Sequence, residues 1–164
     1  MRLSVSLRFS NESNDTVRRI VAALDNIKVT NNELPHITLF STEAQDRNGV
    51  ISVLRRLYHP YDERFATSCG IDVIGGNHLV INIRKTGFVK DIQINIFKMF
   101  KEKYKPDRKY YTPFQWHPHV TIGSLNPTNL HMPSIQEVRF ECIQLVIFDV
   151  DTKTDVYKQN IARR

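Results

Sequence analysis

The sequence predicts an α+β fold in which antiparallel strands and amphipathic helices share one core. Hydrophobic residues make up 41% and charged residues 24% of the 164 positions, which is the balance of a globular protein. Apolar residues recur with a period of two in some segments and at helical spacing in others. The turn 75–77, Gly-Gly-Asn, separates two alternating segments and favours a hairpin over a parallel crossover. The length predicts a single domain over residues 1–164.

The N-terminal segment predicts a strand followed by a helix. Residues 3–9 alternate apolar with polar side chains, so we expect a strand that carries Arg8 on its polar face. Ser13 or Asn14 can then cap a helix, because each side chain accepts a hydrogen bond from a free main-chain N–H. The apolar residues of this helix follow at the expected spacing: Val17, Ile20, Val21, Leu24 and Ile27.

The next four elements are a strand, a helix and a hairpin. Residues 34–40 are strand-like, and residues 46–58 have the apolar stripe of a helix that Pro60 ends. Residues 64–74 and 78–84 alternate and flank the glycine-rich turn, so we expect them to pair as antiparallel strands.

The C-terminal half predicts one more helix and three more strands. Residues 88–104 place aliphatic and aromatic side chains on one side at helical spacing. A strand is expected over 116–123, and residues 124–136, with two prolines and no clear period, predict a loop. Residues 137–149 and 154–160 alternate and predict a final antiparallel pair.

One pentapeptide pattern occurs twice. Residues 35–39 are Pro-His-Ile-Thr-Leu, and residues 118–122 are Pro-His-Val-Thr-Ile. In a strand, residues two apart share a face, so each histidine projects together with its threonine while the apolar residues fill the opposite face. A single His-x-Thr is common in strands for structural reasons alone. The repeat, with the same preceding proline and the same alternation, is what indicates a functional site.

Two imidazoles and two hydroxyls around one small volume suit phosphodiester transfer without a metal. Of His36 and His119, one in neutral form would take a proton from the attacking oxygen, and the other, protonated, would give one to the leaving oxygen. Histidine titrates near neutral pH, so both forms can coexist. The hydroxyls of Thr38 and Thr121 can donate to the non-bridging phosphate oxygens and stabilise developing charge.

The paired His-x-Thr strands, their spacing and the order of elements resemble the 2H phosphoesterase superfamily. Its members include 2′-5′ RNA ligase-like proteins, cyclic nucleotide phosphodiesterases and 2′,5′-oligoadenylate phosphodiesterases. The resemblance implies a two-lobed fold, with two mainly antiparallel sheets flanking a central cleft, helices outside, and no metal or other cofactor. It implies acid/base roles for His36 and His119 and phosphate-binding roles for Thr38 and Thr121.

Basic and aromatic residues alternate before the second motif, which suits a nucleotide, because cations meet phosphate and rings stack on bases. The aromatic residues of the helix 88–104 are expected in the core. In the irregular segment 105–114, Tyr110, Tyr111 and Phe114 are candidates for a lid or a base platform.

Three further side chains are candidates for substrate binding. Arg8, Arg84 and Tyr157 each lie in a predicted strand, where they could contact phosphate. The alternative for each is an ordinary surface position. His117 shares a face with His119 and could assist it, or it simply begins the strand.

Charge and cysteine content set the expected partners and location. Lysine and arginine exceed aspartate and glutamate by 23 − 17 = 6, which favours a polyanionic partner. Cys69 and Cys142 are too far apart in sequence for a zinc or CxxC motif, so we expect free thiols in the cytoplasm. No segment approaches the roughly 18 apolar residues of a membrane span. The protein is expected to be a monomer.

The leading hypothesis is therefore a metal-independent phosphodiesterase that acts at the ribose 2′ position of RNA-type substrates. Either 2′,5′-oligoadenylates or 2′,3′-cyclic phosphates fit, and the sequence does not choose between them. The expected partner is RNA, a short oligonucleotide or a cyclic nucleotide. The alternatives are a 2′-5′ RNA ligase, which runs the transfer in reverse, and an RNA- or nucleotide-binding protein without catalysis.

Overall fold

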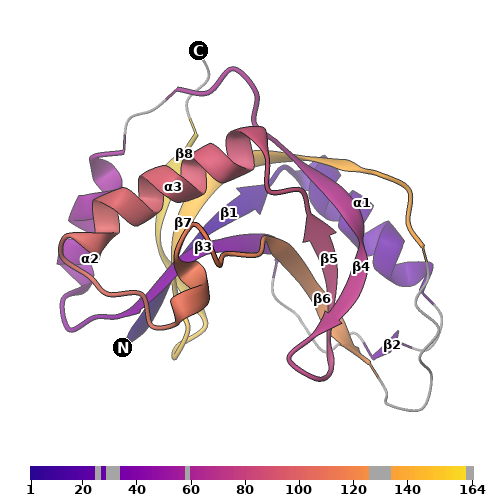
Figure 1. Ribbon diagram of the computed structural model, residues 1–164, viewed down its shortest axis with the longest axis horizontal. Coiled ribbons are helices and arrows are strands. Elements are labelled where there is room, and N and C mark those ends of the chain that lie inside the picture. The colour runs from indigo at the N-terminus through magenta and orange to yellow at the C-terminus, as the bar shows by residue number, and fades with distance from the viewer. Residues whose placement is uncertain (25–26, 29–33, 58–59, 126–133, 162–164) are drawn as a thin grey trace.

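The computed structural model describes residues 1–24, 27–28, 34–57, 60–125 and 134–161 (Figure 1). Within these residues helices separate single strands or pairs of consecutive strands, and three strands come last. In chain order the elements are β1 (Arg2–Phe9), α1 (Asn11–Ala22), β2 (Ile27–Lys28), β3 (His36–Glu43), α2 (Arg47–Arg55), β4 (Phe65–Ile74), β5 (His78–Ile83), α3 (Gly87–Lys101), the short 3-10 helix η1 (Lys109–Tyr111), β6 (His119–Leu125), β7 (Arg139–Asp149) and β8 (Thr154–Asn160).

The described strands join in one curved antiparallel sheet with the order β2-β6-β5-β4-β7-β1-β3, and β8 pairs with β7. The sheet has two halves. One consists of β1, β3, β7 and β8, and the other of β2, β4, β5 and β6. They are linked where residues 65–67 of β4 pair with residues 139–141 of β7. This arrangement confirms the predicted α+β class and its antiparallel pairing.

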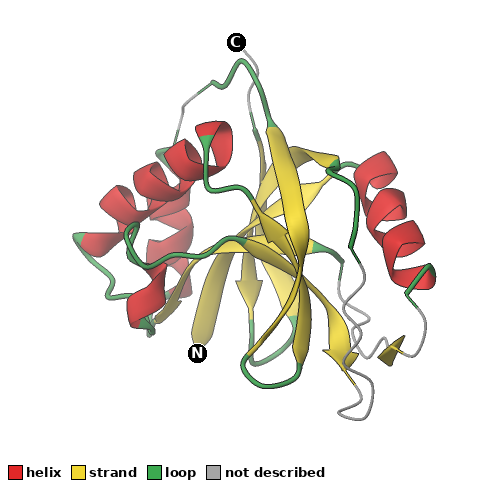
Figure 2. Ribbon diagram, turned by 45° about the vertical axis from the view of Figure 1, so that its right-hand side comes forward, coloured by secondary structure: helices red, strands yellow, loops and turns green. Residues whose placement is uncertain are grey.

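Helices lie on the outside of the two halves (Figure 2). In the first half, α3 packs on β3, where the ring of Phe40 lies 5.3 Å from that of Phe100 and 6.4 Å from that of Phe97. On β1, Leu3, Val5 and Leu7 are buried as the alternation predicted, and the polar residues of the other face, Ser4, Ser6 and Arg8, are buried as well. The polar residues of β1 therefore point to the face of the sheet opposite α3.

The first helix begins and ends earlier than predicted. Its N-cap is Ser10, whose Oγ accepts a hydrogen bond from the Ser13 N–H at 3.3 Å. The predicted cap, Ser13, lies inside the helix, and its Oγ instead accepts from the Glu141 N–H of β7 at 2.8 Å. The helix ends at Ala22, so the prediction that it reaches Ile27 is wrong, because Ile27 pairs with Leu125 in the sheet.

The other elements match the predicted order with shifted ends. Helix α2 starts after Asp46, whose Oδ1 accepts from the Gly49 N–H at 2.9 Å. Strand β6 starts at His119, later than predicted, because the main-chain N–H of Trp116 donates to the Thr112 carbonyl at 2.8 Å in the preceding turn. The predicted loop at 124–136 falls largely on residues 126–133, outside the described residues. No described helix is long and apolar enough to cross a membrane.

Candidate active site

The two motif strands meet although they are far apart in sequence and near opposite ends of the strand order. Curvature of the sheet brings β3 into contact with β6 (Figure 1). The Trp116 Nε1–H, just before β6, donates to the Thr38 carbonyl of β3 at 2.9 Å. His36 is the first residue of β3 and His119 is the first residue of β6. The structure therefore places the two predicted histidines at the starts of adjoining strands.

Strand β3 presents its motif against β1. His36 lies opposite Arg8 and Thr38 lies opposite Ser6, so the four side chains share one face. The register then shifts, and Leu39 is the extra residue of a bulge in β3. Such a bulge changes the direction of the strand directly after the threonine.

Strand β6 presents its motif against β5 in the same way. His119 lies opposite Asn82 and Thr121 lies opposite Val80. The register again shifts directly after the threonine, with Ile122 as the extra residue. Each histidine and each threonine thus has the same position relative to a partner strand and to a bulge. The repeat seen in the sequence is also a repeat in three dimensions.

Both histidine rings make the same local hydrogen bond. His36 Nδ1 lies 3.0 Å from the carbonyl oxygen of Leu34, and His119 Nδ1 lies 2.9 Å from that of His117. A carbonyl can only accept, so Nδ1 must carry the proton in each ring. In the neutral form of each ring the lone pair is then on Nε2. Both imidazoles therefore offer the same nitrogen for proton transfer.

Burial lowers the pKa of His119 below its usual value, because the charged ring is less well solvated there. The hydrogen bond to the His117 carbonyl opposes this shift, while the neighbouring rings of His117 and His78 reinforce it. The neutral form of His119 is therefore favoured near neutral pH.

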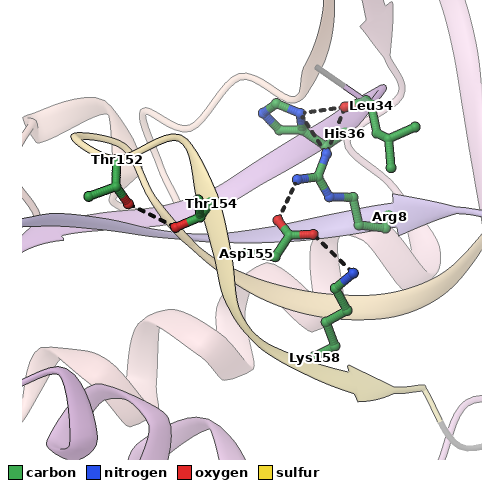
Figure 3. Close-up of polar contacts among 7 residues, drawn as sticks. All are labelled: Arg8, Leu34, His36, Thr152, Thr154, Asp155 and Lys158. Atoms are coloured by element: carbon green, nitrogen blue, oxygen red, sulfur yellow. Dashed lines mark hydrogen bonds and ion pairs between the residues drawn. The ribbon is translucent and has the colours of Figure 1, made fainter. Parts of the chain in front are cut away.

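His36 has different neighbours (Figure 3). Arg8 Nη1 donates to the Leu34 carbonyl at 2.7 Å and lies 3.4 Å from His36 Nδ1. Because both of these nitrogens are donors when Nδ1 is protonated, the longer distance is a close approach rather than a hydrogen bond. Arg8 Nη2 is ion-paired with Asp155 Oδ1 at 3.0 Å, and Lys158 Nζ lies 3.2 Å from Asp155 Oδ2.

The candidate arginines are both engaged within the protein. Arg8 is buried beside His36, and its guanidinium binds Asp155 and the Leu34 carbonyl. Arg84 is exposed and forms an ion pair with Glu137.

The aromatic candidates have different locations. Tyr157 lies opposite Ile147, on the helix side of the sheet, where Arg55 of α2 lies 5.2 Å from its ring. The structure therefore does not bring Tyr157 to the side of the histidines. Tyr111 is partly buried, and its carbonyl accepts from Gln93 at 2.8 Å. Phe114 is 93% exposed, and the side chain of Tyr110 lies outside the described residues.

Two polar residues next to the motifs were not predicted as site residues. Ser6, opposite Thr38, and Asn82, opposite His119, each have a buried side-chain oxygen with no hydrogen-bond partner among the described residues. Buried polar atoms without partners are uncommon, and a catalytic role is one explanation for them. The alternation of residues 3–9 placed Ser6 on the polar face, but only the register shows which threonine it faces.

Across the part of the chain that the structure describes, no three histidine, cysteine, aspartate or glutamate side chains are grouped closely enough to hold a metal ion.

Solved structures share this architecture across the whole chain. TT0787 of Thermus thermophilus matches with a TM-score of 0.69 and 12% identity, covering 100% of both chains. A phosphoesterase matches with a TM-score of 0.69 and 10% identity, covering 99% of both chains. Escherichia coli LigT in complex with phosphate matches with a TM-score of 0.65 and 11% identity, covering 99% of this chain and 98% of LigT.

The chain therefore has the α+β fold of LigT, a 2′-5′ RNA ligase-like 2H phosphoesterase, which confirms the fold that the motif resemblance implied. LigT has also been solved with ATP and with 3′-AMP. No protein-family model matches the sequence, and a search of curated proteins gives no match.

Proposed function

We propose that this protein is a metal-independent phosphodiesterase that cleaves RNA-type phosphodiesters at the ribose 2′ position. The observation that carries the proposal is the structural repeat of the two motif strands. Each strand starts with a histidine whose proton is on Nδ1, and each presents a threonine on the same face before a matching bulge. Cleavage of a phosphodiester needs a proton acceptor at the attacking oxygen and a proton donor at the leaving oxygen. Two such strands supply one histidine for each task.

The environments of the two rings suggest which is the base. The lowered pKa of His119 favours the neutral ring, which can accept a proton at Nε2 from the attacking hydroxyl or water. The new bond forms from that oxygen to phosphorus as the bond to the leaving oxygen breaks. His36 in its protonated form gives the Nε2 proton to the leaving oxygen. The two rings then return to their starting protonation states by exchange with solvent.

The threonine hydroxyls complete the chemistry. Thr38 and Thr121 would donate to the non-bridging oxygens, on which negative charge grows in the transition state. In a 2′,5′-linked substrate the attacking group is the neighbouring 3′-hydroxyl and the product is a cyclic phosphate. In a 2′,3′-cyclic phosphate the attacking group is water.

The nucleotide part of the substrate has support of its own. Phe114, two residues before Trp116, exposes 93% of its surface, so its ring is accessible for stacking on a base. We propose that Phe114 and Tyr111 form a platform for a base and that Arg84 contributes positive charge nearby. LigT, which has this fold, has been solved with phosphate, ATP and 3′-AMP, all of which contain phosphate.

A single assay tests the proposed function. The wild type, His36→Ala and His119→Ala are incubated with 2′,5′-oligoadenylate, 3′,5′-oligoadenylate and a 2′,3′-cyclic nucleotide in the presence of EDTA. We expect the wild type to cleave the 2′-type substrates and both variants to lose that activity. Cleavage that persists in both variants would refute the two-histidine mechanism, and wild-type cleavage that EDTA abolishes would show a metal enzyme.

Two further outcomes separate the alternatives. Joining of RNA ends that carry a 2′,3′-cyclic phosphate and a 5′-hydroxyl would identify a ligase. Tight binding of the oligonucleotides without turnover of any substrate would identify a binding protein.

A further inference from the structure

We infer that Arg8 and Asp155 form a positioning pair that fixes the ring of His36 and has no counterpart at His119 among the described residues. Its catalytic consequence rests on the proposed function, but its effect on the His36 ring does not. A chain of three contacts carries the inference: Asp155 to Arg8, Arg8 to the Leu34 carbonyl, and that carbonyl to His36 (Figure 3).

The geometry of these three contacts leaves the His36 ring one favourable orientation. Asp155 Oδ1 lies 3.0 Å from Arg8 Nη2, and Arg8 Nη1 lies 2.7 Å from the Leu34 carbonyl oxygen. That oxygen also accepts the His36 Nδ1 proton at 3.0 Å. The acceptor that defines the tautomer of His36 is therefore held in place by a charged fork and not by the main chain alone. A guanidinium suits this task because its donors diverge at fixed angles in one plane.

A bulge in β8 places Asp155 where it can bind Arg8. Tyr157 lies opposite Ile147, on the helix side of the sheet, whereas Asp155 lies opposite Phe148. Phe148 lies opposite Ser4, on the same face as Arg8. Residues two apart in a regular strand share a face, so Asp155 would follow Tyr157 to the helix side if the register did not shift between them.

The burial of Arg8 is difficult to explain by stability alone. Arg8 is only 8% exposed, and its Nε is buried with no hydrogen-bond partner among the described residues. Removing a guanidinium from water is costly, and apolar side chains at a buried ion pair are often as stable or more so. A residue kept at this cost beside a predicted catalytic ring is best explained by what it does to that ring.

The second motif shows what the pair adds. The residue opposite His119 is Asn82, in the position that Arg8 has opposite His36. The local Nδ1-to-carbonyl bond is the same at both rings. The charged pair therefore distinguishes the two otherwise matching histidines.

The test uses Asp155→Asn, which is nearly isosteric, and Arg8→Gln. Glu141→Gln is the matched control, because Arg64 pairs with Glu141 at 2.9 Å and also donates to the Ile161 carbonyl at 2.9 Å. The exposed side-chain fractions are similar, 10% and 20% for Arg8 and Asp155 against 13% and 26% for Arg64 and Glu141. Thermal unfolding of each variant shows whether the fold is kept.

The first readout is the ¹⁵N NMR spectrum of the His36 ring, assigned by the signals that His36→Asn removes. The wild type should show the Nδ1–H tautomer, and both site variants should show a mixture of tautomers, while Glu141→Gln matches the wild type. The second readout is steady-state kinetics. We expect kcat to fall by about 10- to 100-fold with little change in KM, as for a misplaced catalytic group.

Each outcome has a defined meaning. If Arg8→Gln raises KM, leaves kcat unchanged and keeps the tautomer, Arg8 binds phosphate and the inference is overturned. If the tautomer is unchanged in Asp155→Asn, the pair only joins β8 to β1, and the inference is again overturned. A tautomer change in a protein that cleaves none of the tested phosphodiesters would uphold the positioning pair and reject the proposed function.

Discussion

At the scale of single residues, the two histidines differ in their surroundings and not in their own strands. His119 is partly buried near His117 and His78, whereas His36 lies beside the Arg8–Asp155 pair. An acid and a base made from the same side chain need such a difference, because identical rings in identical sites would share one protonation state.

The pKa of His119 should lie below the ordinary value of about 6.5 in an NMR titration of the folded protein. Because burial is the largest cause and the His78 ring adds to it, His78→Ala should raise the pKa of His119. A His119 pKa at or above the ordinary value would contradict the assignment of this ring as the base.

The same shift predicts how stability depends on pH. The unfolded chain keeps the ordinary pKa of His119, so below about pH 6.5 it binds more protons at this ring than the folded chain does. This contribution to the free energy of unfolding therefore decreases as the pH falls through that range, and levels off below the lowered pKa. Urea unfolding at a series of pH values checks the effect, which His119→Asn should remove.

Thr38→Val and Thr121→Val should each reduce kcat by roughly 10²–10³-fold, as for loss of one donor to a developing oxyanion. Valine keeps the β-branched shape and suits a strand, so the fold should be retained. Steady-state kinetics and thermal unfolding measured together check this. Wild-type rates in either variant would show that its hydroxyl has no role in the reaction.

Phe114→Ala should raise KM for oligoadenylate without lowering stability. The side chain is 93% exposed, so little packing is lost, whereas stacking on a base contributes about 1–3 kcal/mol. The control substrate has an abasic ribose at the position expected to stack, and its KM should not change. Equal changes for both substrates would exclude the platform.

At the scale of elements, the contact between the motif strands depends on a side chain that belongs to neither. Trp116 is buried, and its Nε1–H donates to the Thr38 carbonyl. Gln93 of α3 donates to the Tyr111 carbonyl at 2.8 Å, which fastens the segment that leads from η1 towards Trp116. The contact of β6 with β3 is thus held by the segment that precedes β6.

Trp116→Phe should lower both stability and kcat. It removes the donor to the Thr38 carbonyl, at a cost of about 1–3 kcal/mol for an unsatisfied buried group, and it loosens β6 against β3. The control is Gln159→Met, which removes a 2.8 Å bond from a side chain to the Leu57 carbonyl away from the motifs. The control should lower stability alone. An equal loss of kcat in both variants would contradict a specific role of Trp116.

The sequence is sufficient to predict most elements, because their apolar periodicity depends on neighbouring residues. The ends of the elements depend on tertiary contacts, so their predicted positions were less accurate. The Ser13 hydroxyl was available as a cap, but it binds β7, and Ser10 caps α1 instead. Ile27 fits the helical period of α1, yet it pairs with β6. No local pattern reveals either partner.

The candidate site shows the same division: the residues within each motif were predicted, and those that depend on contacts between strands were not. The repeated pentapeptide identifies the histidines and threonines, because the pattern lies within each strand. Ser6 and Asn82 become site residues only through strand register. Asp155 and Tyr157 are placed by a bulge in β8, which has no signal in the sequence.

At the scale of the whole molecule, the excess of positive charge should assist the binding of a polyanion. The chain has 23 lysine and arginine residues against 17 aspartate and glutamate residues. Raising the salt concentration from about 50 to about 500 mM should therefore raise KM for an oligonucleotide by about 10-fold, with a smaller effect on kcat. A neutral osmolyte at matched osmolality should have no such effect, and a salt-independent KM would show that the charge does not contribute.

The matched bulges have a consequence for which parts of the molecule distinguish the two histidines. Residues 35–39 and 118–122 have equivalent positions relative to a partner strand and a bulge. Their sequences differ only by Ile against Val and Leu against Ile. Changes of this size in a core are usually tolerated. We therefore expect a chimera in which the two pentapeptides are exchanged to keep its function. The difference between the two imidazoles must then come from outside the pentapeptides, from β1, β5, β8 and His117. Mutations that change the difference between the two rings are therefore to be sought in these surroundings.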